Sequence, residues 1–191
     1  GNRLAFNKAA VGFGIARAAI DVFKEIATGK TPRFTNKKLA ERTFAQRAVA
    51  MAEARLRGSR AAVFEHIAKV WELVIADEPV PDDDRALVHI LCSDAAAATA
   101  QVVDGLAEAA GTTANQIGHP LERIARDSRV IRQHLTVAPH HIEEAGRVLG
   151  AEHAADQSGA ERRQAGEGFG KRLPCRRIVP AVDPHLGRSF I

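Results

Sequence analysis

The chain has 191 residues, of which 46% are hydrophobic and only 5% aromatic, with no tyrosine. Alanine-rich runs favour helices, and the scarcity of aromatic residues argues against a sheet-based fold. Residues 151–191 hold seven Lys and Arg against five Asp and Glu, a charge of +2, which leaves +2 of the total +4 for residues 1–150. Because acids alternate with bases along most of the chain, this charge argues against a nucleic-acid-binding protein.

The first two helices are predicted from apolar residues that recur at helical intervals. The first spans residues 4–27 and ends at Gly29, a residue type that commonly terminates helices. The second begins after Thr35 or Asn36, either of which can cap exposed backbone amides, and runs to about Ala76. A helix of roughly 40 residues would be about 60 Å long, which suits a helix bundle.

Two further helices follow a chain reversal at residues 77–84, where three aspartates precede the third helix and complement its positive end. The third helix stops at Gly111, and residues 112–119 form a polar connection. Pro120 suits the first turn of the fourth helix, because the amide that proline lacks would be unpaired there anyway. This helix is expected to continue to a break at Pro139.

A shorter helical piece covers residues 140–149 and closes at Gly150. The pattern predicts an all-α fold, an up-and-down four-helix bundle over residues 1–150, followed by a poorly ordered basic tail over residues 151–191. Two alternatives for the tail are a frameshifted segment and a basic arm that binds a polyanion. The arm would use Arg162, Arg163, Lys171, Arg172, Arg176 and Arg177.

Membrane and secretion signals are not expected. Charged residues interrupt the apolar runs well short of the ~20 residues that a bilayer span needs. The first residues also lack the basic region and apolar block of a secretory signal. Cys92 and Cys175 lie far apart, which suits a reducing cytoplasm better than a disulfide framework.

Common catalytic patterns do not occur in the chain. A di-metal bundle would need two Glu-x-x-His motifs, and His140 with Glu143 offers only the reverse order, so no metal is expected. There is no Gly-x-Ser-x-Gly nucleophile motif. Gly12 and Gly14 lie inside a predicted helix with no strand before them, and they indicate close helix packing rather than a dinucleotide site.

The segment 109–134, AAGTTANQIGHPLERIARDSRVIRQH, is the best candidate for a site. Arg123 and Arg126 near a helix start, beside a glycine-containing loop with free amides, could bind a phosphate group. The alternative is surface ion pairing between these arginines and the neighbouring acids. Asp127 and His134 are seven residues apart and would share a face of the fourth helix.

The order of the helices and the sequence AAGTTANQIGHPLERIARDSRV resemble the carboxy-terminal helical domain of the acyl-CoA dehydrogenase superfamily, over residues 3–150. In that family a Gly-Gly loop precedes a Pro-x-x-Arg-x-x-Arg-Asp helix. The residues that match the helix motif are Pro120, Arg123, Arg126 and Asp127. Gly111 occupies a position of the family's glycine pair. The sequence KKLAERTFAQRAVA resembles the segment that follows the family's Arg-x-x-Phe-Gly motif, and Arg33 lies in the corresponding connection.

This resemblance implies binding of FAD or FMN, at a site that is often shared with a neighbouring subunit in a homo-oligomer, a dimer or tetramer. The residues it assigns to the cofactor are Arg33, Gln46, Gly111, Thr112, Arg123, Arg126 and Asp127. Gln46 matches a family glutamine near the flavin interface.

One departure from the dehydrogenase pattern concerns the catalytic base. Many acyl-CoA dehydrogenases carry Ile-Tyr-Glu-Gly-Thr after the Arg-Asp helix, whereas this chain has His134 at the tyrosine and Leu135 at the glutamate. A leucine cannot abstract a proton. The sequence therefore resembles the flavin-dependent monooxygenase branch, in which His134 would face flavin or substrate. The alternative is a core histidine that bonds to nearby backbone.

The family's amino-terminal helical domain and middle β-domain have no counterpart in these residues. We therefore expect a truncated or separately encoded carboxy-terminal domain, inactive alone, whose partner supplies the missing domains. Two rival classes remain. One is a helical oligomerisation module that uses the faces of the second and third helices, and the other is a helical DNA-binding regulator, which the long second helix argues against.

Overall fold

The computed structural model describes the backbone of residues 2–155 and the side-chain surroundings of residues 4–150. Within these residues the chain consists only of helices and connections, which confirms the all-α prediction. The predicted tail lies outside the described residues, except for residues 151–155, which belong to the last helix.

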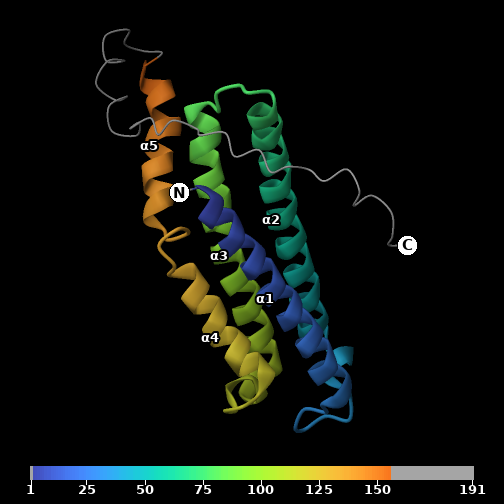
Figure 1. Cartoon of the computed structure of the whole chain (residues 1–191). Helices are drawn as coiled ribbons and strands as arrows, with labels where there is room; N and C mark the ends of the chain where they lie inside the picture. The colour runs from blue at the N-terminus through green and yellow to red at the C-terminus, as the bar shows by residue number, and fades with distance from the viewer. Residues whose placement is uncertain (1, 156–191) are drawn as a thin grey trace, which may run out of the picture. The chain divides into compact units, whose positions relative to one another are not determined.

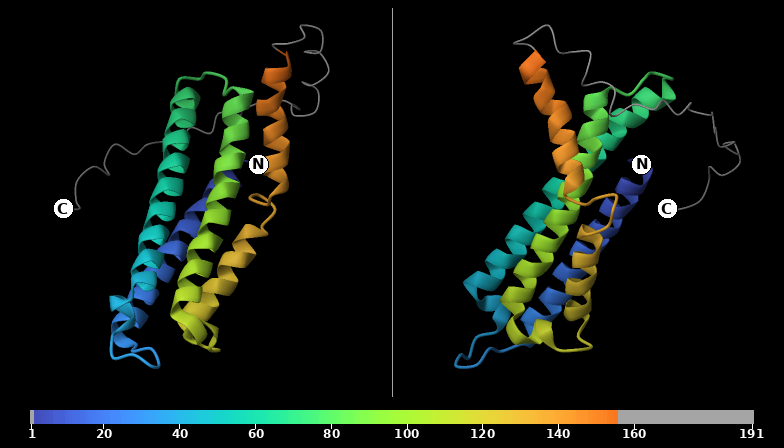
Figure 2. Two further views of the ribbon diagram at one scale, coloured as in Figure 1. Left: turned by 180° about the vertical axis from the view of Figure 1, so that it is seen from behind. Right: turned by 90° about the vertical axis from the view of Figure 1, so that its left-hand side faces the viewer.

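The described residues form five α-helices and two short 3-10 helices (Figure 1). The α-helices are α1 (Asn2–Gly29), α2 (Thr43–Ile75), α3 (Asp82–Ala110), α4 (Pro120–Arg132) and α5 (His140–Ala155). The 3-10 helices are η1 (Leu39–Glu41) and η2 (Gly111–Asn115). Helices α1 to α4 lie side by side and alternate in direction, so the up-and-down bundle is confirmed (Figures 1 and 2).

Helix α3 is the central element of the bundle. Helices α1, α2 and α4 all pack along it, while α1 and α2 contact each other much less. The face of α1 toward the core is a stripe at helical spacing made of Ala5, Ala9, Phe13, Ala16, Ile20, Phe23 and Ala27. The corresponding buried residues of α3 include Ala95, Ala96, Val102, Val103 and Leu106. Small side chains on both helices let their backbones approach closely.

The two glycines of α1 differ in their surroundings. A Cβ at Gly12 would lie 2.8 Å from Thr99 Oγ1 of α3, so close helix packing requires glycine there, as predicted. A Cβ at Gly14 would meet nothing within 4 Å. The packing explanation is therefore wrong for Gly14, which faces an opening rather than a neighbouring helix.

Helix α3 together with η2, Asp82–Asn115, is long and apolar enough to cross a membrane by length and composition, with a mean hydropathy of 1.5. The charged residues along the chain had predicted no such segment. Over half of its most apolar window, 56%, is buried inside the protein, as in the core helix of a bundle. Its hydropathy therefore follows from its central position.

Helix α2 begins at Thr43, so the prediction of a helix start after Thr35 or Asn36 is wrong. Residues 30–42 form a connection in which Leu39 is buried and its amide donates to the Lys30 carbonyl, at 2.9 Å. The Thr35 hydroxyl accepts from the Lys37 amide and caps no α-helix. Because Leu39 is buried in this connection, α2 begins only at Thr43.

Two other helix ends also differ from prediction. Helix α4 stops at Arg132 and not at Pro139, since the chain turns to bury Val137. Thr136 and Val137 are β-branched, and Ala138 precedes a proline, so all three positions also disfavour a helix. Helix α5 continues past Gly150 to Ala155. A glycine inside a helix costs only about 1 kcal/mol, and the Ala-rich residues that follow favour continuation.

Candidate functional site

Two connections meet at one end of the bundle, the lower end in Figure 1. Lys30 Nζ, just after α1, donates to the Ala110 carbonyl at 2.7 Å and to Thr113 Oγ1 at 2.8 Å. These bonds join the connection 30–42 to the end of α3 and to η2. Sequence reasoning missed Lys30, although its position directly after Gly29 marks it as a residue at a helix end.

Gly111 ends α3 with a positive φ of 66° and ψ of −147°. This conformation strains any residue with a Cβ, so glycine is required here. The predicted end of the third helix is confirmed. Thr112 follows as an exposed residue of η2.

Arg33 and Gln46, the two candidates nearer the amino terminus, are both exposed. Arg33 lies in the connection that Lys30 attaches to α3. Gln46 lies in the first turn of α2, and its side-chain nitrogen donates to the Ala40 carbonyl at 3.1 Å. These candidates therefore lie on elements that meet at one end of the bundle, although they are far apart in sequence: Arg33 on the connection 30–42, Gln46 at the start of α2, and Gly111 and Thr112 on η2.

Helix α4 starts at Pro120, as predicted. The amides of its first turn all have partners within the chain. His119 Nδ1 accepts from the Leu121 amide at 3.1 Å, and the His119 carbonyl accepts from the amides of Glu122 and Arg123 at 3.1 and 3.4 Å. An anion at this helix start would therefore depend on side chains rather than on amides.

Arg123 and Arg126 of α4 are each paired with an acid one turn away. Arg126 makes two bonds to Glu122, at 2.6 and 3.3 Å, and Arg123 lies 3.6 Å from Asp127. These are the ion pairs of the surface alternative. Both arginines are well exposed, and such pairs contribute at most about 1 kcal/mol each. Either guanidinium group can therefore leave its carboxylate for an anion that binds it more strongly. The role of these arginines in cofactor binding stays a prediction.

His134 lies beyond the end of α4, so the prediction that it shares a helical face with Asp127 is wrong. The side chain is exposed, which also excludes the alternative of a core histidine. Its Nδ1 lies 3.0 Å from Thr136 Oγ1 and accepts from the Thr136 amide at 3.3 Å. The 13 residues of α4 separate His134 from the Gly111 connection by roughly 20 Å of helix.

A cluster of histidines joins α5 to α3. The rings of His89 and His141 stack with centroids 4.9 Å apart, and the ring of His140 lies 4.2 Å from that of His141. His141 Nε2 lies 2.7 Å from the Leu135 carbonyl, and Nδ1 lies 3.3 Å from Glu144. Burial, with the neighbouring His141, lowers the pKa of His89. Within residues 4–150 no three His, Cys, Asp or Glu side chains are arranged to hold a metal ion.

Comparisons with known proteins identify the family model and the relatives that this bundle matches. The family model "Acyl-CoA dehydrogenase, C-terminal domain" matches residues 7–139. An indole-3-acetate monooxygenase from Pseudomonas putida is 37% identical over 139 residues, covering 73% of this chain. A second indole-3-acetate monooxygenase, from Acinetobacter baumannii, is 28% identical over 138 residues, covering 72% of this chain. The chain spans only 36% of the length of each of these relatives.

Solved structures show the same fold. The 3-HSA hydroxylase from Rhodococcus sp. RHA1 superimposes with a TM-score of 0.68 at 23% identity, covering 81% of this chain and 38% of that chain. The HsaA monooxygenase from M. tuberculosis gives 0.68 at 24% identity, covering 81% and 39%. Both matches again leave more than half of the relative without a counterpart.

Proposed function

Because this chain belongs to the family of acyl-CoA dehydrogenase C-terminal domains, we propose that it is the helical carboxy-terminal part of a flavin-dependent monooxygenase acting on an aromatic compound. The observation that carries this proposal is the 37% identity to an indole-3-acetate monooxygenase over most of the bundle. The reaction would require the portion of the relatives that these 191 residues do not cover.

FAD or FMN is proposed to bind at the end of the bundle where the connection 30–42 meets η2 and the start of α4, at a site shared with a neighbouring subunit. Arg123 and Arg126 would exchange their exposed carboxylate partners for the cofactor's phosphate, which binds arginine more strongly. The other proposed contacts are Arg33, Gln46, Gly111, Thr112 and Asp127. The bound flavin supplies the redox chemistry, while these residues bind and orient it.

The residues after α4 support monooxygenation rather than acyl-CoA dehydrogenation. Leu135 is 72% exposed and has no group that accepts a proton. His134 beside it keeps Nδ1 as the acceptor of the Thr136 amide, so the proton of the neutral ring resides on Nε2. We assign to His134 Nε2 a hydrogen bond to substrate or flavin.

The proposed partners are further copies of the chain, forming a dimer or tetramer, together with the domains that supply the rest of the flavin site. An exposed apolar surface on the second half of α2 supports assembly. This surface comprises Phe64, Trp71, Val74 and Ile75, each about half exposed or more. The same surface favours the second candidate function, an oligomerisation module without catalysis. The proposed location of the assembly is the cytoplasm.

A chimera tests the enzyme proposal. Residues 7–139 would replace the matching segment of the Pseudomonas putida indole-3-acetate monooxygenase, and flavin content and oxygen-dependent turnover of indole-3-acetate would be measured. We expect a chimera that retains both. A folded chimera without flavin, whose oligomeric state is unchanged, would instead support the oligomerisation module.

A charge-matched pair of variants within the chimera tests the flavin contacts. Replacing Arg123 and Arg126 together by Gln is expected to weaken flavin binding at least tenfold, about two lost charge-assisted contacts. Replacing Arg129 and Arg132 together by Gln is the control, because both are exposed arginines of the same helix and the same two charges are removed. Equal losses in the two variants would contradict a specific role for Arg123 and Arg126.

A further inference from the structure

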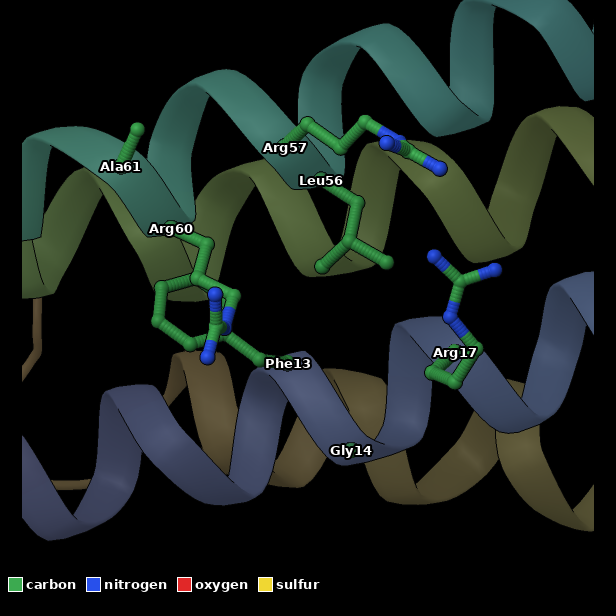
Figure 3. A pocket seen from close by; sticks show the side chains of 7 residues that line it. All are labelled: Phe13, Gly14, Arg17, Leu56, Arg57, Arg60 and Ala61. Atoms are coloured by element: carbon green, nitrogen blue, oxygen red, sulfur yellow. The ribbon is translucent and has the colours of Figure 1, made fainter.

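A groove opens between α1 and α2, midway along both helices and outside the residues proposed for flavin. It forms because both helices pack on α3 and little on each other, which leaves a hollow of about 460 Å³ (Figure 3). The groove is lined by Phe13, Gly14, Arg17, Leu56, Arg57, Arg60 and Ala61. Its volume is within the range of about 300–1,000 Å³ that is typical of ligand pockets.

The inner wall of the groove is apolar. Phe13 of α1 and Leu56 of α2 point into the gap from opposite sides, and both are almost fully buried, at 7% and 5% exposure. Gly14 follows Phe13 on α1 and presents no side chain to the groove, and a Cβ built there would meet nothing within 4 Å. The missing side chain keeps the groove open, so an apolar body can reach Phe13 and Leu56.

The rim of the groove carries more positive than negative charge. Arg17 binds Glu53 through two bonds, at 2.7 and 2.9 Å, and Arg57 contacts the same carboxylate at 3.1 Å. Lys24 also lies 3.6 Å from Glu53, and Asp21 adds a weaker attraction on Arg17. The single carboxylate of Glu53 therefore lies among three cations and neutralises only part of their positive charge.

Arg60 forms no salt bridge with any described residue. Its guanidinium lies 4.5 Å from the centre of the Phe64 ring, a cation–π contact that orients the group and leaves its N–H donors available. Figure 3 shows the side chain extending from α2 toward the groove. A planar guanidinium beside an apolar wall is suited to a carboxylate or sulfonate on an apolar body.

We propose that this groove binds an amphipathic organic anion, with its aromatic or short aliphatic body on Phe13 and Leu56 and its acidic group on Arg60. Arg17 and Arg57 strengthen the positive potential, and Glu53 weakens it. The site is independent of the proposed flavin function, because no residue is common to the two.

The test uses the full 191-residue chain and anilinonaphthalenesulfonate, an aromatic anion whose fluorescence rises in apolar surroundings. We expect saturable binding of one probe per chain. Arg60→Gln should weaken it about three- to tenfold, the contribution of one charge-assisted contact. Gly14→Met should abolish it by filling the groove. Glu53→Gln should strengthen it, since Arg17 and Arg57 lose their shared carboxylate.

Two controls separate the groove from other surfaces. Arg55→Gln removes the same charge from an exposed position of α2 that does not line the groove. Neutral phenylnaphthylamine reports apolar contact alone, and its affinity should not change in Arg60→Gln. Circular dichroism establishes that each variant is folded. The proposal is overturned if the chain shows no saturable binding, if folded Gly14→Met binds normally, or if Arg60→Gln and Arg55→Gln have equal effects.

Discussion

Glu53 is the carboxylate that holds α1 to α2, and its replacement by Gln is the sharpest test of how the bundle is stabilised. Its side chain is 22% exposed and is bonded by Arg17 across the helices and by Arg57 within α2. The hydrogen bonds from Arg17, assisted by Arg57, lower the pKa of Glu53 from 4.5 to about 2. The folded state therefore favours the charged form of this residue.

The magnitude follows from these two pKa values. Their separation corresponds to at most about 3 kcal/mol of unfolding free energy, because each pKa unit is about 1.4 kcal/mol. The arginines are partly in water, at 41% and 77% exposure, so screening reduces the value to about 1–2 kcal/mol. We expect Glu53→Gln to lower the free energy of unfolding by this amount at pH 7.

The pH dependence has a definite sign. Because the pKa of Glu53 is lowered on folding, its contribution is complete above 4.5 and is lost as the pH falls through that value toward 2. The difference between wild type and Glu53→Gln should therefore be constant from pH 7 to pH 5.5 and shrink below pH 4.5.

Urea unfolding followed by circular dichroism at several pH values measures this difference. Glu65→Gln is the matched control, since Glu65 is an exposed carboxylate of the same helix. A double-mutant cycle with Arg17→Gln isolates the pair between the helices. The reasoning is refuted if Glu53→Gln is no less stable than Glu65→Gln, or if its deficit persists unchanged at pH 3.

Three further predictions concern other contacts. Gly12→Ala should destabilise the bundle by about 1–3 kcal/mol through overpacking against Thr99, whereas Gly14→Ala should stabilise it by up to about 1 kcal/mol; thermal unfolding measures both. Lys30→Met should cost about 1–3 kcal/mol and speed amide exchange in residues 111–115, because the Ala110 and Thr113 acceptors lose their donor. The pKa of His89 is lowered by burial, so folding favours its neutral form and stability should fall as the pH drops below about 6.5; His89→Gln should flatten this loss in urea unfolding.

Each of these predictions has a clear contrary result. Equal stability of the two alanine variants would mean that α1 and α3 do not approach as closely as described. Unchanged amide exchange in Lys30→Met would show that the two connections are held together by other contacts. A pH profile that does not change in His89→Gln would remove the histidine cluster as a source of acid sensitivity.

The number, order and direction of the bundle helices could be predicted from sequence because their signals are local. Apolar spacing marks the buried stripe of α1, Gly111 ends α3 because its backbone needs a positive φ, and Pro120 begins α4. Family membership was also accessible, since the motif of α4 is carried by contiguous residues. Resemblance alone pointed to Arg33, Gln46, Gly111 and Thr112, and the elements that hold them meet at one end of the bundle.

Two errors in the candidate site arose where burial outweighed local preference. The connection before α2 follows Leu39 into the core, and α4 ends where Val137 is buried. The second of these removed His134 from the helical face that the sequence predicted.

The amino-acid sequence by itself determined the helices, their order and the family of this protein, because backbone conformation and amphipathic spacing depend on near neighbours. Only the tertiary structure decided which distant residues meet. Lys30 reaches Ala110, His89 stacks on His141, and Arg17 shares Glu53 with Arg57 across an open groove. Such contacts depend on how whole helices pack, so no periodicity in the sequence encodes them.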